Sequence, residues 1–250
     1  MDELELLVDL HRSGQRQGPG GSKETRRALE MTGLAQARGL RVADIGCGTG
    51  SASLLLAEWL DAEIVAVDLF PEFLAELNDR ARTRGFSERI RTLEASMDAL
   101  PFAADEFDLI WSEGAIYNMG FEAGHQAWRR FLKPGGMLVV SEITWLTAER
   151  PPALQAHWER EYPEIDTASA KVAQLERHGY RPEAYFVLPP DGWLTNYYEP
   201  LEASFEAFLE RNAHSESARN IVEAERREIA LYRRYRDFYS YGFYIASRID

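Results

Sequence analysis

The chain has 250 residues, 45% of them hydrophobic, and a formal net charge of −13. This length supports a folded core, and the charge disfavours a nucleic acid as the main partner because phosphate backbones attract clustered Lys and Arg. The single cysteine, Cys47, excludes an internal disulfide framework. No apolar run is long enough to span a membrane, and the acidic N-terminal segment does not resemble a signal peptide. We therefore expect a soluble, cytoplasmic protein.

The first part of the chain alternates between helix and strand patterns. An acidic N-terminal helix is followed by the glycine-rich loop SGQRQGPGGS and by a helix over 23–37, with Ser22 as its N-cap. Pro71 is expected at the start of a later helix, and Pro134 is expected to stop another. The predicted strands are 40–45, 62–68, 89–96, 106–112 and 136–145, and the helices between them are 49–60, 71–85 and 122–136.

The pattern changes after Trp145. The later elements are expected to be a helical stretch at 152–179, a strand at 180–188, charged helices over 201–237 and a closing aromatic strand at 239–249. The earlier β–α alternation favours an open, mostly parallel α/β sheet with helices on both faces. The two late strands are predicted to add an antiparallel edge to this sheet.

The first predicted strand runs into the sequence ADIGCGTGS, a D-x-G-x-G-x-G pattern from Asp44 to Gly50 with Gly46 and Gly48 between them. Such a loop binds a ligand at the carboxyl end of the strand. A dinucleotide fingerprint needs a small third residue where this chain has Ser51, so that match is imperfect. The Asp44 carboxylate would repel a pyrophosphate, but it suits a ligand that carries an ammonium and a sulfonium. The pattern therefore favours S-adenosylmethionine (SAM).

Carboxylates follow the next two strands as well. Asp68 ends the second strand, where it can accept hydrogen bonds from ribose hydroxyls, a feature shared with nicotinamide enzymes. In the sequence ASMDALPF after the third strand, Met97 can pack on an adenine ring and Asp98 can accept from its amino group. Leu69 and Gln17 are further candidate cofactor-binding residues.

The segments VADIGCGTG, VAVDLF, ASMDALPF, FDLIWSEG and LKPGGMLVVSE resemble the successive motifs of class I SAM-dependent methyltransferases. Within that class the chain is similar to the ubiquinone/menaquinone and sterol methyltransferase-like group. The resemblance covers about residues 40–145 and implies a Rossmann-like, doubly wound sheet of seven strands with the last antiparallel. By motif position it assigns Asp44 and the three glycines to the methionine part of SAM, Asp68 to the ribose, and Met97 and Asp98 to the adenine.

The methyl acceptor is expected above the ends of the fourth and fifth strands. Tyr117, Glu113 and Glu142 are the candidate catalytic residues, with either glutamate as a base if the acceptor loses a proton. Either glutamate could instead hold the cofactor or an ammonium of the substrate. The candidate pocket residues are Asn118, Trp145, Trp193, Tyr197 and Tyr198. The glycine-rich loop before residue 22 is expected to close over the site as a lid.

Other conspicuous residues have ordinary structural interpretations. Cys47 is expected to be a small packing residue, and the five histidines show no metal-ligand spacing, so no metal is predicted. His125 is the one histidine expected near the site. The charged run ERREIALYRRYRD at 225–237 is predicted to be a solvated helix face.

Three functions stay open at this stage. A SAM-dependent methyltransferase acting on a small molecule is favoured over a nicotinamide-dependent oxidoreductase and over a non-catalytic SAM-binding protein. A nucleic-acid base is disfavoured because SEGA at 112–115 stands where such methylases carry Asp/Asn-Pro-Pro-aromatic. Neither linker nor repeat is evident, so one domain over 1–250 is expected, either as a monomer or as a homodimer. Its parts are lid helices at 1–38, a cofactor core at 39–145 and a substrate-side region at 146–250.

Overall fold

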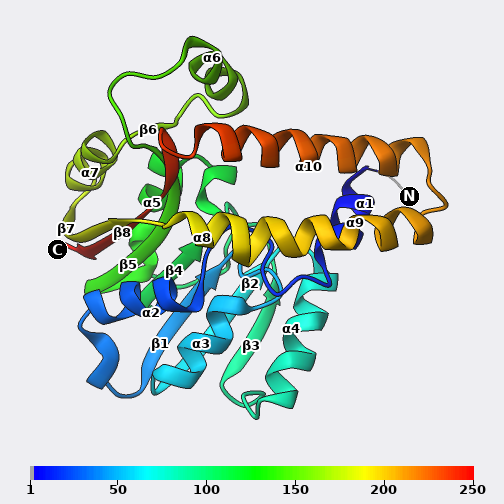
Figure 1. Cartoon of the computed structure of the whole chain (residues 1–250). Coiled ribbons are helices and arrows are strands. Elements are labelled where there is room, and N and C mark those ends of the chain that lie inside the picture. The colour runs from blue at the N-terminus through cyan, green and yellow to red at the C-terminus, as the bar shows by residue number, and fades with distance from the viewer. Residues whose placement is uncertain (1–2) are drawn as a thin grey trace.

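A computed structural model describes residues 3–250, and a sheet in the strand order β3-β2-β1-β4-β5-β8-β7 lies at its centre (Figure 1). The first five strands pair in parallel, whereas β8 runs antiparallel to both β5 and β7. The strand bounds are β1 Leu40–Ile45, β2 Ala62–Asp68, β3 Ile90–Glu94, β4 Phe107–Glu113, β5 Leu132–Trp145, β6 Asp166–Thr167, β7 Tyr180–Val187 and β8 Tyr239–Arg248.

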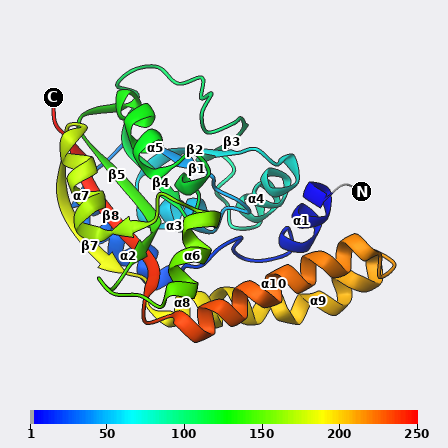
Figure 2. The same cartoon turned by 90° about the horizontal axis from the view of Figure 1, so that it is seen from above.

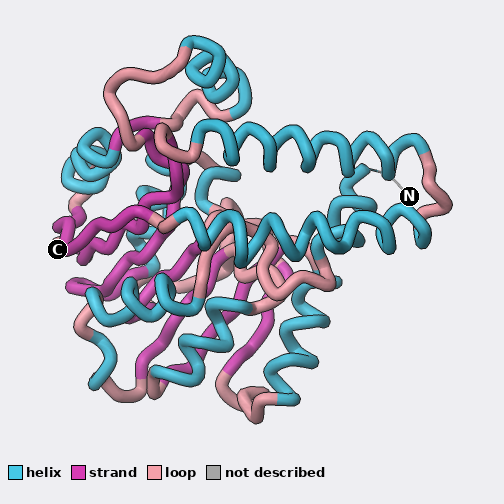
Figure 3. The backbone as a smooth tube through the Cα atoms, in the orientation of Figure 1, coloured by secondary structure: helices cyan, strands magenta, loops and turns pink. Residues whose placement is uncertain are grey.

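Helices cover both faces of this sheet and one of its ends (Figure 3). The α-helices are α1 Glu3–His11, α2 Ser22–Met31, α3 Ser51–Trp59, α4 Pro71–Thr83, α5 Phe121–Trp128, α6 Pro152–Glu161, α7 Ala168–Arg177, α8 Pro190–Trp193, α9 Glu199–Arg211 and α10 Glu216–Tyr235. Short turns of tighter or wider helix span Leu34–Gln36, Ile116–Asn118, Arg129–Phe131 and Leu194–Tyr198. Within residues 3–250, none of the helices is long and apolar enough to cross a membrane.

The period-two pattern of the central strands separates two hydrophobic cores. In β1, Val42 faces the core that contains α2, α3 and α4, whereas the next residue, Ala43, faces the core that contains α5 and α7. The same alternation holds in β2, where Ile64 and Val65 point to opposite faces. Strands that are buried on both faces read as continuous apolar runs, which is why these strands were predictable.

A roof of three helices lies over the carboxyl ends of the parallel strands. Figures 1 and 2 show α9 and α10 running side by side across the molecule, with α1 packed at their far end. The α9–α10 pair belongs to the long helical segment that joins β7 to β8, so this late part of the chain returns over the first βα turns. The roof therefore faces the end of the sheet at which β1, β2 and β4 terminate.

The predicted α/β fold with an antiparallel late edge is confirmed, with corrections at three places. The sheet has eight strands rather than seven because the two-residue β6 pairs with the end of β5, and so short a strand has no sequence signature. Helix α2 begins at Ser22 itself, and its N-cap is Gly21, which offers no capping side chain. Pro134 lies inside β5, where an irregular register between Phe107 and Leu109 of β4 accommodates it, and the preceding helix ends earlier, at Trp128.

A buried ion pair ties α7 to the centre of the sheet. Lys171 Nζ lies 3.0 Å from Glu142 Oε1 of β5, both side chains have no accessible surface, and the ammonium also donates to the Glu164 carbonyl at 3.1 Å. Burial raises the pKa of Glu142 while the ammonium lowers it. Losing one partner would leave an uncompensated charge in the protein interior.

We expect Lys171→Met to lower the free energy of unfolding by about 3–5 kcal/mol, the cost of stranding the Glu142 carboxylate. Adding Glu142→Met should recover most of this loss because no buried charge remains. The matched control is Lys133→Met, which removes a partly exposed pair with Asp108 and should cost less than about 1 kcal/mol. Urea denaturation measures all three variants, and equal losses for the two lysine variants would contradict the assignment.

Candidate functional site

A cavity of about 1210 Å³ lies between the carboxyl ends of β1, β2 and β4 and the helical roof. Most of the residues predicted from the sequence line it. These are Gln17, Asp44, Gly46, Gly48, Asp68, Leu69, Met97, Asp98, Glu113, Tyr117, Asn118, Trp193, Tyr197 and Tyr198. The structure thus brings the candidate cofactor residues and the candidate acceptor residues to one continuous space.

The three glycines after β1 are required by the protein's own packing. Gly46, Gly48 and Gly50 have positive φ values of 74°, 54° and 86°. A Cβ at Gly48 would collide with the side-chain oxygen of Gln17, and one at Gly50 would collide with Leu77. Gly50 therefore does not line the cavity as predicted, since it serves as the N-cap of α3 against α4.

The backbone of this loop offers no free cradle for a phosphate. The N–H groups of Gly46 and Cys47 both donate to the Val67 carbonyl, at 2.8 and 2.9 Å. Gly48 N–H donates to Asp68 Oδ2 at 2.8 Å, so a carboxylate already occupies the position of a bound anion. A pyrophosphate needs such donors to be free. The loop therefore disfavours a dinucleotide.

Asp44, at the end of β1, is a buried carboxylate beside the cavity. Only 1% of its surface is accessible, and the Ser53 hydroxyl donates to Oδ2 at 2.5 Å. No Lys or Arg of residues 3–250 forms an ion pair with it within 4.0 Å. Burial, together with the nearby charges of Glu113 and Asp68, raises the pKa of Asp44 to about 7. A ligand cation would stabilise its ionised form.

Asp68 stands at the end of the neighbouring strand and holds the turn that follows it. Its Oδ1 accepts from the Phe70 N–H at 3.1 Å, while Oδ2 accepts from Gly48, and burial raises the pKa of this carboxyl. Leu69, next in the chain, leaves 54% of its surface accessible where it lines the cavity. Met97 and Asp98 line the cavity from the segment after β3. One wall of the cavity therefore carries a hydrogen-bond acceptor, Asp68, followed by the apolar side chains of Leu69 and Met97 and by a further carboxylate, Asp98.

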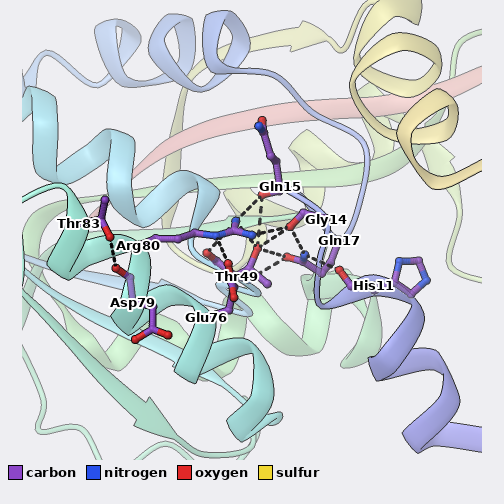
Figure 4. A network of polar contacts seen from close by, with 9 residues as sticks. All are labelled: His11, Gly14, Gln15, Gln17, Thr49, Glu76, Asp79, Arg80 and Thr83. Carbon is purple, nitrogen blue, oxygen red and sulfur yellow. Dashed lines mark hydrogen bonds and ion pairs between the residues drawn. The ribbon is translucent and has the colours of Figure 1, made fainter. Parts of the chain in front are cut away.

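The predicted lid loop is closed over this wall. Gln17 accepts from the Thr49 N–H at 2.8 Å and donates to the His11 and Gly14 carbonyls. Figure 4 shows Arg80 of α4 reaching the same point, with hydrogen bonds of 2.9 Å to Thr49 Oγ1 and 3.0 Å to the Gly14 carbonyl. The loop between α1 and α2 is thereby joined to the glycine loop and to α4.

Glu113, predicted as a base, instead fastens the lid to the end of β4. Arg16 of the lid loop donates to its Oε2 from both terminal nitrogens, at 3.0 and 2.6 Å. Oε1 accepts from Thr25 at 2.7 Å and from the Trp111 indole at 3.0 Å. Both carboxylate oxygens are thus committed to contacts with the lid loop, α2 and β4. Glu113 is therefore a positioning residue.

Two other predicted site residues lie outside the cavity lining. Glu142 points away into its pair with Lys171, so it cannot serve as the base. Trp145 is 4% exposed and packs between the Arg150 guanidinium and the Tyr239 ring. Both lie in the long β5 strand, where a residue's face follows from pleat and register, and the sequence alone left the register open.

Tyr117 and Asn118 lie in the turn after β4. Tyr117 keeps 40% of its surface accessible and contacts the Tyr162 ring edge-to-face, with centroids 6.2 Å apart. Loss of hydration among neighbouring side chains raises the pKa of Tyr117, so its hydroxyl stays protonated at neutral pH. Asn118 donates to the Ala115 carbonyl at 2.9 Å and fixes the turn. Tyr117 is thus held between the roof and the wall that carries Asp44, Asp68 and Met97, which we call the cofactor wall after its predicted ligand.

The sequence analysis missed the contribution of the roof helix. Glu225 and Glu228 of α10 line the cavity, so the charged run 225–237 is not wholly a solvated face as predicted. His11 and His157 line it too, whereas His125 is fully buried away from it. A signal was present, because the glutamates interrupt the apolar stripe of α10 that includes Ile221.

Comparison with known proteins agrees with this geometry. Residues 42–136 match a family model described as a methyltransferase domain. The chain is 34% identical over 131 residues to a malonyl-(acyl-carrier protein) O-methyltransferase of Enterobacter lignolyticus, covering 51% of this chain and 47% of that protein. It is 27% identical over 157 residues to the 27-O-demethylrifamycin SV methyltransferase of Amycolatopsis mediterranei, covering 62% and 56%. The chain thus spans about half the length of these curated relatives.

The fold match extends over nearly the whole chain. A SAM-dependent methyltransferase from Geobacter sulfurreducens, solved with S-adenosylhomocysteine, superimposes with a TM-score of 0.83 at 17% identity and covers 98% of both chains. The similarity in fold therefore extends beyond the sheet to the segments that form the roof. Residues 42–136 match a methyltransferase-domain model, and the chain as a whole has the fold of this solved methyltransferase.

Proposed function

We propose that the protein transfers a methyl group from SAM to a small-molecule acceptor held in the cavity between the strand ends and the roof. The observation that carries this proposal is the Asp44 carboxylate, which is buried at the cavity wall without an ion-pair partner. A buried carboxylate is costly unless a cation meets it. SAM carries an ammonium and a sulfonium, and its nucleoside suits the wall formed by Asp68, Leu69 and Met97.

The residues present fit this cofactor. Asp44 would hold the ammonium, Asp68 the ribose hydroxyls, and Leu69, Met97 and Asp98 the adenine. When bound, SAM supplies a methyl group that its sulfonium already activates. The remaining task of the chain is to align the acceptor and to exclude water.

The lid performs the exclusion. Arg16 bonds to Glu113 and Gln17 bonds to Thr49, and these two contacts hold the loop over the cavity. The Gln17 contact requires glycine at position 48, where a Cβ would collide with the Gln17 side chain. Tyr117 stands where the loop after β4 faces the roof, so we assign its ring to bounding the acceptor and its hydroxyl to orienting it.

The acceptor is proposed to be a small molecule because the cavity of about 1210 Å³ is of a size that the cofactor and a small molecule can share. The names of the two curated relatives refer to a malonyl carrier-protein thioester and to a rifamycin, both organic acceptors rather than nucleic acids. The family match ends at residue 136, before α6 and α10, which supply the acceptor side of the cavity. The similarity to the ubiquinone/menaquinone and sterol group, and the single-domain organisation, stay predictions.

Calorimetry with S-adenosylhomocysteine and NADH tests the cofactor. We expect micromolar binding of S-adenosylhomocysteine and no measurable binding of NADH, because the loop N–H groups are occupied and two carboxylates face the ligand. Tight binding of NADH alone would favour the oxidoreductase alternative. Binding without methyl transfer to any of a broad acceptor panel would favour a non-catalytic SAM-binding protein.

The affinity for S-adenosylhomocysteine should fall as the pH drops below about 7. The pKa of Asp44 is raised to about 7 by burial, and the ligand ammonium selects the ionised carboxylate, so binding is full above this pKa and weakens below it. The slope should approach a tenfold loss per pH unit, or about 1.4 kcal/mol. Calorimetry between pH 5.5 and 7.5, a range of about two units chosen around that pKa, measures it.

Two variants identify the titrating group. Asp44→Asn should bind more weakly and lose the pH dependence. Ser53→Ala keeps the carboxylate but removes the hydrogen bond that stabilises it, so the midpoint should move to higher pH. An unchanged profile in Asp44→Asn would assign the titration to another group.

Tyr117→Phe should separate alignment from cofactor binding. We expect S-adenosylhomocysteine affinity to stay within about twofold and kcat to fall at least about tenfold, or ~1.4 kcal/mol of barrier, because alignment acts on the transition state. The matched control is Tyr185→Phe in β7, which lies outside the cavity lining and should leave kcat unchanged. Radiolabelled methyl transfer to an acceptor from the panel gives kcat. A collapse of cofactor affinity instead would place Tyr117 in the cofactor site.

A further inference from the structure

Two carboxylates of the roof face the cavity from one side of α10. Glu225 and Glu228 are three residues apart, which places them on the same helix face. They stand in the stripe that Ile221 and Tyr232 continue at either end with buried apolar side chains. Glu225 is partly buried and Glu228 is exposed where each lines the cavity. The two carboxylates therefore give this part of the cavity a negative charge that a bound ligand would meet.

The partners of these carboxylates are weak. Glu228 Oε1 accepts from the Tyr198 hydroxyl at 2.9 Å, and Glu225 lies 3.5 Å from His11 Nε2. Among residues 3–250, no Lys or Arg forms an ion pair with either carboxylate. The neighbouring arginines of the lining are engaged elsewhere, Arg160 with Glu161 and Arg227 with Glu223.

The two charges also raise each other's energy. Surrounding protein and the charge of Glu225 raise the pKa of Glu228, although its surface stays accessible where it borders the cavity. Like charges on one helix face repel. A cation placed between them would relieve this repulsion.

Aromatic rings form the rest of this end of the cavity. Tyr197 and Tyr241 line it and are only 9% and 8% exposed, yet neither hydroxyl has a hydrogen-bond partner in the described part of the chain. Trp193 packs on Tyr241 with ring centroids 4.8 Å apart, and Tyr117 and Tyr239 complete the lining. Ring faces attract cations, and the unpartnered hydroxyls of these two largely buried tyrosines, which line the cavity, point to a polar ligand.

We propose that the methyl acceptor is a small organic cation, an amine or ammonium compound, whose charged nitrogen lies between Glu225, Glu228 and the tyrosine rings. A different atom of the same molecule, one with a lone pair, would attack the methyl carbon of SAM while S-adenosylhomocysteine leaves. An anionic acceptor would meet two carboxylates there, and an uncharged one would leave them uncompensated. This inference rests on the proposed function because it names the acceptor class of the same cavity. It concerns the roof, which is separate from the Asp44 and Asp68 wall.

The test compares a cation with its uncharged isostere. Choline has a quaternary nitrogen where 3,3-dimethylbutan-1-ol, called dimethylbutanol below, has a carbon. The two molecules therefore have nearly the same shape and differ in charge. Calorimetry on the full chain, with and without saturating S-adenosylhomocysteine, should give at least about tenfold tighter binding of choline. Glu228→Gln, which keeps the size and the Tyr198 contact but removes the charge, should abolish that preference. The affinity for S-adenosylhomocysteine should stay within about twofold of the wild-type value.

Glu223→Gln is the matched control, because Glu223 lies on the same helix, is exposed, and does not line the cavity. It should keep the choline preference. If Glu228→Gln does not fold, as judged by its thermal melting, Glu225→Gln carries the same test.

Each outcome decides one of the two proposals. Equal binding of choline and dimethylbutanol to the wild-type protein, or a preference retained in Glu228→Gln, overturns the cationic acceptor. If such a result accompanies normal S-adenosylhomocysteine binding, the proposed methyl transfer stands. A choline preference without S-adenosylhomocysteine binding would contradict the proposed function while supporting the cation site.

Discussion

The parallel pairing of β1, β2 and β4 brings their carboxyl ends to one edge of the sheet, and the whole candidate site depends on this constraint. It places Asp44 at the end of β1 and Asp68 at the end of β2 side by side, with Glu113 at the end of β4. Three carboxylates so close would repel one another. The structure separates their roles, because Glu113 is paired with Arg16 and Asp68 accepts two backbone N–H groups, whereas Asp44 has only the Ser53 hydroxyl.

This division of roles joins the loop between α1 and α2 to the carboxylates at the sheet edge. Arg16 neutralises Glu113 only when the loop between α1 and α2 lies over the cavity, and Gln17 reaches Thr49 in the same arrangement. Opening the loop would expose a carboxylate pair at the sheet edge and break the Arg80 contacts with the loop backbone. The ion pair therefore favours the closed form electrostatically, and a cation bound at Asp44 would lower the repulsion that remains.

The sequence predicted the parts of the site that local chemistry determines. A strand followed by Asp44 and glycines, and another ended by Asp68, carry their positions in a short pattern, so both were found at the cavity. Glu142 could not be placed, because its direction depends on the pleat of β5 and on Lys171, 29 residues later. Glu225 and Glu228 were missed because only the packing of α10 over the distant strand ends turns a charged run into a cavity wall.

The two ends of the cavity thus have different origins in the chain. The cofactor wall comes from consecutive βα turns within the matched methyltransferase domain, whereas the acceptor wall comes from α10 and the aromatic strand β8. The roof is joined to the sheet by packing, because Phe208 and Ile221 belong to the same hydrophobic core as Val42 of β1. Under the proposed function, acceptor choice would fall to the cavity-facing side chains of α10 rather than to those that pack in this core, and they include two carboxylates beside tyrosines.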